Sequence, residues 1–202
     1  EGKPYKTSGG KMVYNETLKR EIPEGWEVKE LNNIAEIIMG QSPKGKSYNT
    51  DGNGVLLING AADYVGDYLN PRIFTSEPTR LSKKDDLIFC IRATIGKLTY
   101  SEKEYCLGRG VASVRSKTEV LREYIYFSLN QEIERFKKHA SGSIIIGITK
   151  DDLTDYFVLL PDKESLNIFH KIVNPLHQKI RKNLKQNQEL SALRDWLLPM
   201  LM

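Results

Sequence analysis

Apolar side chains recur every three or four residues along the last part of the chain, from Ser165 onward, and no glycine interrupts them. This spacing places the apolar side chains on one face of an α-helix. The stripe is too long for one small domain to cover, and a long helix with one apolar seam favours pairing with another helix. We therefore predict a long interface helix over residues 164–202, with folding back onto its own domain as the alternative. The predicted seam consists of Leu166, Phe169, Val173, Leu176, Ile180, Leu184, Asn187, Leu190, Leu193 and Leu197.

Two residues interrupt this apolar pattern. Pro175 has no backbone N–H and clashes with the preceding helical turn. We therefore expect either a kink at Pro175, or one helix that ends near Asn174 and a second that starts at Pro175. Asn187 falls within the seam, where a polar side chain often fixes the register or the orientation of a partner helix.

The residues before this helix show a different pattern of short apolar runs between turn residues, which is typical of strands. The runs predicted to be strands are 34–39, 55–58, 87–91, 111–114 and 156–160. Helical periodicity is confined to residues 119–138 and a short turn at 151–153. Short strands in irregular order with few helices indicate an α+β domain with a curved, mostly short-stranded sheet. We expect this domain to occupy residues 21–163, and the polar residues 1–20 to form a linker or arm.

Length and composition exclude several classes of protein. A chain of 202 residues suits one domain of ordinary size, or one domain plus an appendage. Its 40% hydrophobic and 28% charged residues exclude wholesale disorder. No apolar run approaches the roughly 18 residues that span a bilayer, and the first residues lack the apolar stretch of a secretion signal, so we expect no membrane partner. Two cysteines, Cys90 and Cys106, fit a reducing cytoplasm. Because the chain begins with Glu1 rather than Met, we expect a fragment or a processed product.

Residues 40–47 match the phosphate-binding pattern G-x-x-x-x-G-K-[ST]. Such a loop binds phosphates because its backbone amides wrap them and a helix starts immediately afterwards. A strand before Gly40 is plausible, but residues 48–54 are rich in Asn, Asp and Gly and form a poor start to a helix. A nucleotide-binding protein that uses residues 40–47 is therefore the alternative hypothesis. A polar loop able to meet phosphates or base edges is favoured over it.

Catalytic and metal-binding patterns are sparse. Asp85 and Asp86 precede a strand, but no Glu-x-Lys follows at a distance that suits a nuclease, so a turn and strand cap is favoured. His170 and His177 have no Cys or Asp at ligand spacing, which favours surface histidines. The chain contains neither a G-x-S-x-G nucleophile elbow nor the Asn/Asp-Pro-Pro-Tyr element of DNA methyltransferases. We predict no catalytic residue and no metal site.

Cationic and hydrogen-bonding residues gather in the loops beside the predicted strands. The loop 92–97 follows one strand and 108–110 precedes another, while 141–143 and 149–150 flank the apolar segment 144–148. Arginine can read guanine, glutamine or asparagine can read adenine, and glycine lets a loop approach a groove closely. Together these loops make nucleic acid the leading class of partner. A plain scaffold whose loops bind nothing remains the alternative.

An ordered series of segments carries a family resemblance. The segments are 22–28, 40–43, 85–96, 142–143 followed by Ile148, 159–161 and 190–198. In this order the chain resembles the specificity subunit of type I restriction–modification systems, or one half of such a subunit, from residue 22 to the C-terminus. The family's usual Pro-Pro and Glu-Gln before the helix is replaced by residues 161–165, which leaves the start of the helix open.

The resemblance implies both an architecture and a function. Members of the family join two target-recognition domains by two long helices that pack as an antiparallel coiled coil, and each domain reads one half of a split DNA site. This chain has one domain and one helix, so it is expected to be the C-terminal half of a longer subunit or a half-subunit that pairs with itself. The implied role is non-catalytic recognition of double-stranded DNA in the cytoplasm. The implied partners are methyltransferase (modification) subunits, an endonuclease/translocase subunit and a second recognition domain, and S-adenosylmethionine, ATP and Mg²⁺ are expected on the partner subunits, with no cofactor in this chain.

The DNA-reading residues of this family vary, so the expected contacts come from the loops alone. We expect lysines mostly to hold phosphates, and Gln41 and Arg92 to read bases. The residues predicted to contact DNA are Gln41, Ser42, Lys44, Lys46, Tyr48, Arg92, Thr94, Lys97, Arg109, Ser143 and Lys150.

The net charge of +4 is unevenly distributed. Residues 164–202 contain six Lys or Arg and three Asp or Glu, so the predicted helix carries +3 and the preceding 163 residues carry only +1. The basic excess thus lies away from the loops expected to read bases. We therefore expect this domain to bind DNA tightly only when partner subunits supply further phosphate contacts.

Overall fold

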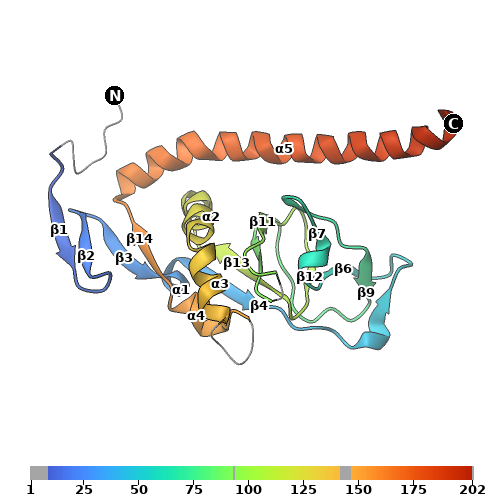
Figure 1. Ribbon diagram of the computed structural model, residues 1–202, viewed down its shortest axis with the longest axis horizontal. Coiled ribbons are helices and arrows are strands. Elements are labelled where there is room, and N and C mark those ends of the chain that lie inside the picture. Colours follow the sequence, from blue (N-terminus) through green and yellow to red (C-terminus); the bar gives the residue numbers. More distant parts are fainter. Residues whose placement is uncertain (1–8, 93, 142–146, 202) are drawn as a thin grey trace.

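A four-stranded antiparallel sheet with the strand order β11-β10-β13-β4 lies at the centre of the computed structural model, which describes residues 9–92, 94–141 and 147–201 (Figure 1). Its strands are β4 (Ala35–Met39), β10 (Leu87–Cys90), β11 (Leu98–Tyr100) and β13 (Val111–Ser116). All four residues of β10 are buried. Leu87 and Phe89 join one hydrophobic cluster, whereas Ile88 and Cys90 join another. Because successive side chains of a strand point to opposite faces, this strand is apolar throughout and both faces of the sheet are covered.

The remaining strands form separate small sheets beside the central one. A second four-stranded sheet has the order β12-β6-β9-β5, in which β12 and β6 run parallel. Its strands are β5 (Tyr48–Asn49), β6 (Val55–Ile58), β9 (Ile73–Thr75) and β12 (Cys106–Leu107). The two-stranded sheets are β3 (Glu27–Glu30) with β14 (Phe157–Leu160), β7 (Tyr64–Val65) with β8 (Tyr68–Leu69), and β1 (Met12–Asn15) with β2 (Arg20–Pro23). The mixed α/β class with short strands and few helices is confirmed.

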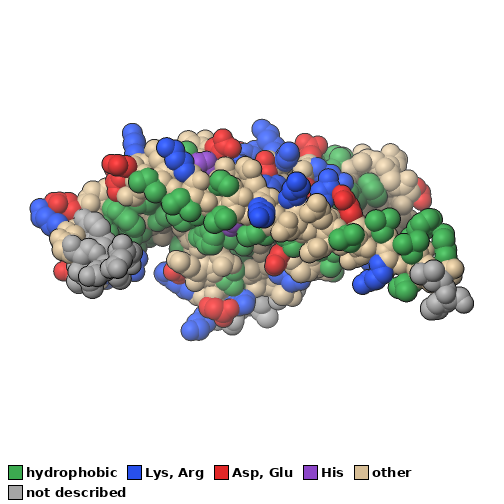
Figure 2. Space-filling view, turned by 90° about the horizontal axis from the view of Figure 1, so that it is seen from above, with side chains coloured by type: hydrophobic (Ala, Val, Ile, Leu, Met, Phe, Trp, Pro, Cys, Tyr) green, Lys and Arg blue, Asp and Glu red, His purple; other side chains and the backbone are tan. Residues whose placement is uncertain are grey.

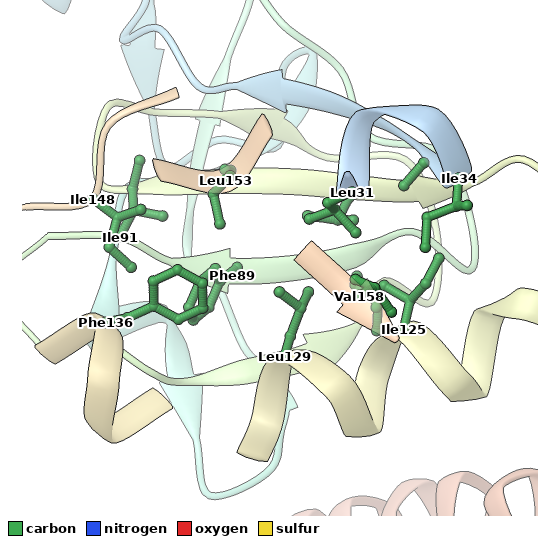
Figure 3. Close-up of a cluster of buried hydrophobic side chains, with 14 of the residues drawn as sticks. Leu31, Ile34, Phe89, Ile91, Ile125, Leu129, Phe136, Ile148, Leu153 and Val158 are labelled. Atoms are coloured by element: carbon green, nitrogen blue, oxygen red, sulfur yellow. The ribbon is translucent and has the colours of Figure 1, made fainter. Parts of the chain in front are cut away.

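Short helices cover one face of the central sheet. They are α1 (Leu31–Ile34), α2 (Arg122–Gln131), α3 (Ile133–Ser141) and α4 (Lys150–Thr154), with the 3-10 turn η4 (Glu119–Leu121) before α2. Figure 3 shows Leu31, Ile125, Leu129, Phe136 and Leu153 from these helices pointing toward the sheet, and all five are buried. The helical pattern over 119–138 is therefore confirmed, although the chain breaks it at Glu132, which lies between α2 and α3.

The long helix α5 (Lys163–Leu201) runs along one side of the domain, and its last part extends beyond α2 (Figure 1). It continues without a break through Pro175, so the predicted division into two helices near Asn174 is wrong. Within the described residues, no helix is long and apolar enough to cross a membrane.

The segment predicted to be a linker contains a hairpin. Strand β1 pairs with β2 in the register Met12↔Pro23 to Asn15↔Arg20. An ion pair of 2.6 Å between Lys11 and Glu24 closes its open end. Both side chains of that pair are exposed and only Ile22 is buried, so the hydrophobic pattern of this segment did not indicate strands.

Candidate nucleic-acid interface

Three loops that were predicted to contact DNA emerge at one end of the central sheet. Met39, the last residue of β4, lies opposite Ala112, and Cys90, the last residue of β10, lies opposite Val111. Because β13 runs antiparallel to both neighbours, its first residues lie beside the last residues of β4 and β10. The loops after Met39 and Cys90 and the loop before Val111 therefore lie at the same end of the central sheet.

Backbone hydrogen bonds tie these loops to one another and to the second sheet. They run from Gly40 N to Val111 O (3.0 Å), Gln41 N to Leu107 O (2.8 Å), Ile91 N to Gly110 O (2.9 Å), Ile148 N to Ile91 O (2.9 Å) and Gly108 N to Ile58 O (2.7 Å). Main-chain bonding of this kind satisfies backbone groups that no regular strand pairs. The loop ends therefore form one connected surface.

Glycines permit the close crossing of these loops. A Cβ on Gly40 would lie 2.0 Å from the carbonyl oxygen of Gly108, and a Cβ on Gly110 would lie 2.0 Å from that of Asn59. A Cβ on Gly108 would lie 2.3 Å from Asn59 Oδ1. Real Cβ atoms do not approach backbone oxygen this closely, so glycine is required here by steric contact.

Five of the predicted DNA-contact residues come together on this surface, which we call the loop cluster. Its members are Gln41, Ser42, Arg92, Thr94 and Arg109. The backbone N–H of Arg109 donates to Ser42 Oγ at 3.3 Å, which joins the first loop to the third. Ser42 is half-buried, whereas the other four side chains are exposed. The cluster thus presents two guanidinium groups, an amide and two hydroxyls.

Five other predicted residues lie outside this cluster, and Ser143 lies outside the described residues. Lys44 and Lys46 are exposed farther along the first loop, and Tyr48 begins β5 at the edge of the second sheet. Lys97 is half-buried with its ammonium 5.7 Å from the centre of the Tyr64 ring. Lys150, at the start of α4, lines a separate hollow of about 360 Å³ beside Lys117 and Glu36.

Asn59 is a candidate that the sequence analysis missed. It is exposed and directly follows the buried end of β6, as Arg92 follows Ile91 after β10. Asp63 fixes its position, because one carboxylate oxygen accepts hydrogen bonds from the backbone N–H groups of Asn59 (2.7 Å) and Gly60 (3.1 Å). The available signal was this polar residue directly after the apolar run 55–58.

The phosphate-loop pattern of residues 40–47 does not have the structure of a phosphate loop. Gly45–Ser47 form a single 3-10 turn, η2, and strand β5 follows at once. The helix N-terminus that would bind a phosphate is therefore not formed. The hydroxyl of Ser47 is buried, donates to Lys44 O at 2.7 Å and lies 2.8 Å from Thr75 Oγ1, so it is used structurally. The structure does not support the nucleotide-binding hypothesis.

The acidic pair before β10 has a structural role. The Asp86 side chain is 2% exposed and accepts hydrogen bonds from Ser113 Oγ and from Nε and Nη2 of Arg115, each at 2.8 Å. The hydrogen bonds to Asp86 raise the pKa of the Arg115 guanidinium. Within residues 9–92, 94–141 and 147–201, no group of three or more His, Cys, Asp or Glu side chains is arranged to hold a metal ion.

Two buried groups close to the loop cluster are held in their neutral forms. Burial raises the pKa of the Cys90 thiol, whose Sγ lies 3.3 Å from Arg92 O. Burial also raises the pKa of Tyr64 well above its usual value, and its hydroxyl donates to Ile88 O at 3.1 Å. A protonated thiol is a poor nucleophile. Cys90 and Tyr64 are therefore packing residues that support the loops.

His170 and His177 are not surface histidines, which corrects that prediction. Both lie between α5 and the domain. His170 Nδ1 lies 2.9 Å from Oε2 of the buried Glu123. His177 packs among the rings of Tyr100, Tyr126 and Phe127 at centroid distances of 5.1–5.8 Å, and burial lowers its pKa. They contribute to the attachment of α5.

The predicted seam of α5 divides between two faces. Leu166, Phe169, Val173 and Leu184 are half-buried on the side of the domain, where the Phe169 ring lies 5.6 Å from that of Tyr124. The remaining predicted residues, Leu176, Ile180, Asn187, Leu190, Leu193 and Leu197, are exposed. Figure 2 shows hydrophobic side chains exposed along this helix among lysines and arginines. The helix thus folds back onto its own domain and still leaves an apolar face uncovered.

Comparisons with known proteins show which proteins this chain is similar to. A family model, the type I restriction modification DNA specificity domain, matches residues 23–191. The MjaX type I restriction enzyme specificity subunit of Methanocaldococcus jannaschii is 30% identical over 185 residues, which cover 90% of this chain and 44% of that protein. The HindI specificity subunit of Haemophilus influenzae is 26% identical over 197 residues, which cover 90% of this chain and 42% of that protein.

A solved structure shares the fold. The crystal structure of the HsdS subunit from Thermoanaerobacter tengcongensis superposes with a TM-score of 0.67 at 30% identity, covering 84% of this chain and 41% of that one. The chain therefore spans somewhat under half the length of the relatives it matches.

Proposed function

Because the chain belongs to the family of type I restriction modification DNA specificity domains, we propose that it recognises one half of a bipartite site in double-stranded DNA. In this proposal it is a non-catalytic specificity module of a type I restriction–modification complex. The observation that carries the proposal is the loop cluster, in which three loops meet at one end of a rigid sheet.

The chemistry of the loop cluster suits base edges in a DNA groove. Arg92 and Arg109 each offer the forked donors that pair with O6 and N7 of guanine. The amides of Gln41 and Asn59 offer the donor and acceptor that pair with adenine. Because backbone hydrogen bonds connect the loops, these exposed side chains are displayed on a pre-organised surface.

Exposed lysines beside the cluster suit the phosphate backbone. Lys44 and Lys46 follow Gln41 and Ser42 along the first loop. Contacts to phosphate fix the register of a protein on DNA without reading its sequence. We assign these lysines to that role.

The uncovered apolar face of α5 suits a second helix, from a second recognition domain in the same or another chain. In this proposal, methyltransferase subunits and an endonuclease/translocase subunit bind the assembled module in the cytoplasm, and S-adenosylmethionine, ATP and Mg²⁺ act on those subunits. The charge distribution supports this division of labour, since residues 1–163 carry a net charge of only +1. A domain with so small a net charge attracts the phosphate backbone only weakly, so we expect weak DNA binding by the chain alone.

Sequencing methylated positions in a host that carries this chain with its methyltransferase subunits tests the proposal. We expect methylation at one bipartite motif, and we expect Arg92→Ala to relax a single base pair in one half of it. A folded complex that methylates no defined motif would contradict the proposal. Nucleotide binding by the chain that Lys46→Ala abolishes would instead support the alternative.

A further inference from the structure

Within the described residues, polar contacts attach α5 to the domain at two places, which involve different parts of the domain. The first is on α2, where Glu123 meets His170, and Arg122 Nη2 donates to Asn174 Oδ1 at 3.2 Å. The second is an ion pair of 2.7 Å between Arg181 Nη1 and Asp85 Oδ1. In the described part of the chain, Arg181 makes the last polar contact between α5 and the domain before the helix end.

Arg181 contacts the base of the hairpin formed by β10 and β11. Its guanidinium lies 5.2 Å from the centre of the Tyr100 ring, at the end of β11. Asp85 is bound to the same base, because its N–H donates to Ser101 O at 2.9 Å and Ser101 N donates to Asp86 O at 2.8 Å. A planar guanidinium that both pairs with a carboxylate and stacks on a ring is held in one orientation.

The opposite end of this hairpin carries part of the loop cluster. Cys90 N donates to Lys97 O at 2.8 Å, which closes the loop that contains Arg92 and Thr94. The buried pair between Asp86 and Arg115 fixes the hairpin within the central sheet. A change of angle at the Asp85 end would therefore be transmitted to the reading loop as a movement of a rigid body.

The second attachment restricts rotation of the domain relative to α5 effectively, because it lies far from the first along the helix. His170 and Arg181 are 11 positions apart, which is about 16 Å along a helix at ~1.5 Å per residue. The ring packing of His177 against Tyr100 already restricts rotation of the domain about α2 relative to the helix axis. The second attachment restricts this rotation further, because it adds an ion pair beyond His177.

We propose that the ion pair between Asp85 and Arg181 is a positioning contact that fixes the angle between the reading hairpin and α5. Resting on the proposed function, we further infer that this contact sets the spacing between the half-site read by this domain and the other half of the DNA site. Arg181 and Asp85 act through the hairpin and do not themselves touch DNA.

Distance measurements between two spin labels test the contact without any reference to DNA. Labels on Thr50→Cys and Ser191→Cys report the domain and the helix end, since both positions are exposed, whereas Cys90 and Cys106 are buried. Dilution with unlabelled chain restricts the signal to distances within one molecule. We expect Asp85→Asn and Arg181→Gln each to broaden the distance distribution. We expect Arg181→Lys, which keeps the positive charge, to leave the distribution nearly as narrow as in the wild type.

The controls keep this test specific. Lys179→Gln removes one positive charge from the same turn of α5 at an exposed position, and we expect it to leave the distribution unchanged. Thermal unfolding of each variant verifies that it is folded. Asp85→Asn is well suited because Asp85 has φ of 70°, a conformation that asparagine adopts readily. Distributions as narrow in both ion-pair variants as in the wild type would overturn the proposal.

The second measurement is the methylation pattern of the complex. We expect Arg181→Gln to leave the sequence of each half-site unchanged while methylation extends to sites with a longer or shorter spacer. An unchanged spacer preference in a variant whose distance distribution is broad would overturn the inference about spacing. If the wild-type complex methylates no bipartite site, the proposed function fails, and the spin-label result still decides the positioning contact.

Discussion

Glu123 on α2 and His170 on α5 are joined by a hydrogen bond of 2.9 Å between Oε2 and Nδ1. The Glu123 side chain is only 2% exposed, and its other oxygen accepts a hydrogen bond of 3.0 Å from Arg122 Nε. Arg122 in turn reaches Asn174 on α5. One buried carboxylate therefore connects α2 to the long helix directly through His170 and indirectly through Arg122 and Asn174.

Replacing Glu123 by alanine should destabilise the protein strongly. The change leaves the largely buried guanidinium of Arg122 without its main partner, and breaking a buried ion pair by removing one member costs about 3–5 kcal/mol. Urea unfolding of the purified chain measures this loss. Glu119→Ala is the matched control, because Glu119 is exposed and lies 3.8 Å from the same guanidinium. We expect the control to cost less than about 1 kcal/mol, and equal costs for the two variants would contradict a structural role for the buried acid.

Replacing each of the two glycines of the 40–47 segment by alanine should change the free energy of unfolding by very different amounts. Gly40→Ala puts a Cβ 2.0 Å from Gly108 O and should destabilise the chain by about 1–3 kcal/mol through overpacking. Gly45→Ala meets no atom within 4 Å and should change the free energy of unfolding by less than about 1 kcal/mol. Thermal unfolding distinguishes the two. If Gly45→Ala were the more damaging, the close crossing at Gly40 would not be what requires glycine.

The sequence predicted most reliably the elements whose pattern is local. Strand β10 was evident because Leu87–Cys90 are apolar on both faces of a covered sheet, and α5 was evident because its apolar residues repeat at helical spacing. The hairpin of β1 and β2 was missed because it buries little, with Ile22 its only buried side chain. Local patterns do not report elements that are stabilised mainly by backbone pairing.

The two faces of α5 show why one predicted seam became two. Its docking face includes His170, Asn174, His177 and Arg181, whose contacts are hydrogen bonds, ring contacts and an ion pair. An analysis of apolar periodicity does not register such residues. Exposed apolar residues follow one another at intervals of four, at Ile168, Ile172, Leu176 and Ile180. Because four residues rotate about 40° past a full turn of a helix with ~3.6 residues per turn, this exposed series winds gradually around α5.

The sequence nominated the predicted DNA-contact residues one by one, but it did not show which of them lie together. Arg92 and Gln41 were found because each follows a predicted strand. Their proximity depends on the register of β4, β10 and β13, in which Met39 and Cys90 lie opposite Ala112 and Val111. That register is a long-range property of the sheet, so a single sequence does not specify it.

Arg92→Ala and Lys46→Ala should affect DNA binding in different ways. If Arg92 reads a base, its loss should cost about 1–3 kcal/mol on the cognate half-site and relax one base pair. If Lys46 contacts a phosphate, its loss should weaken binding about equally on all sequences and reduce the salt slope by about 1. Titrations of the assembled complex with cognate and shuffled DNA at several salt concentrations measure both. Equal losses on all sequences for Arg92→Ala would exclude base reading by that residue.

His177 should make stability fall in mild acid. Burial lowers its pKa below the usual 6.5, with opposing charge effects from Glu123 and from Arg122 and Arg181. As the pH falls below about 6.5, the unfolded chain therefore binds a proton at this position more readily than the folded chain does. The stabilising contribution is fully present above that pH and is lost as the pH falls through the lower, folded-state pKa.

Comparison with His177→Phe isolates this contribution. The phenylalanine keeps an aromatic ring among Tyr100, Tyr126 and Phe127 but cannot be protonated. Between about pH 7.5 and about pH 5.5, we expect the unfolding free energy of the wild type to fall more steeply than that of the variant. Glu123, Arg122, Arg181 and His170 are present in both proteins, so the difference between the two curves reports His177. Parallel curves would show that His177 titrates alike in the folded and unfolded chains, and that burial between α2 and α5 does not disfavour its protonation.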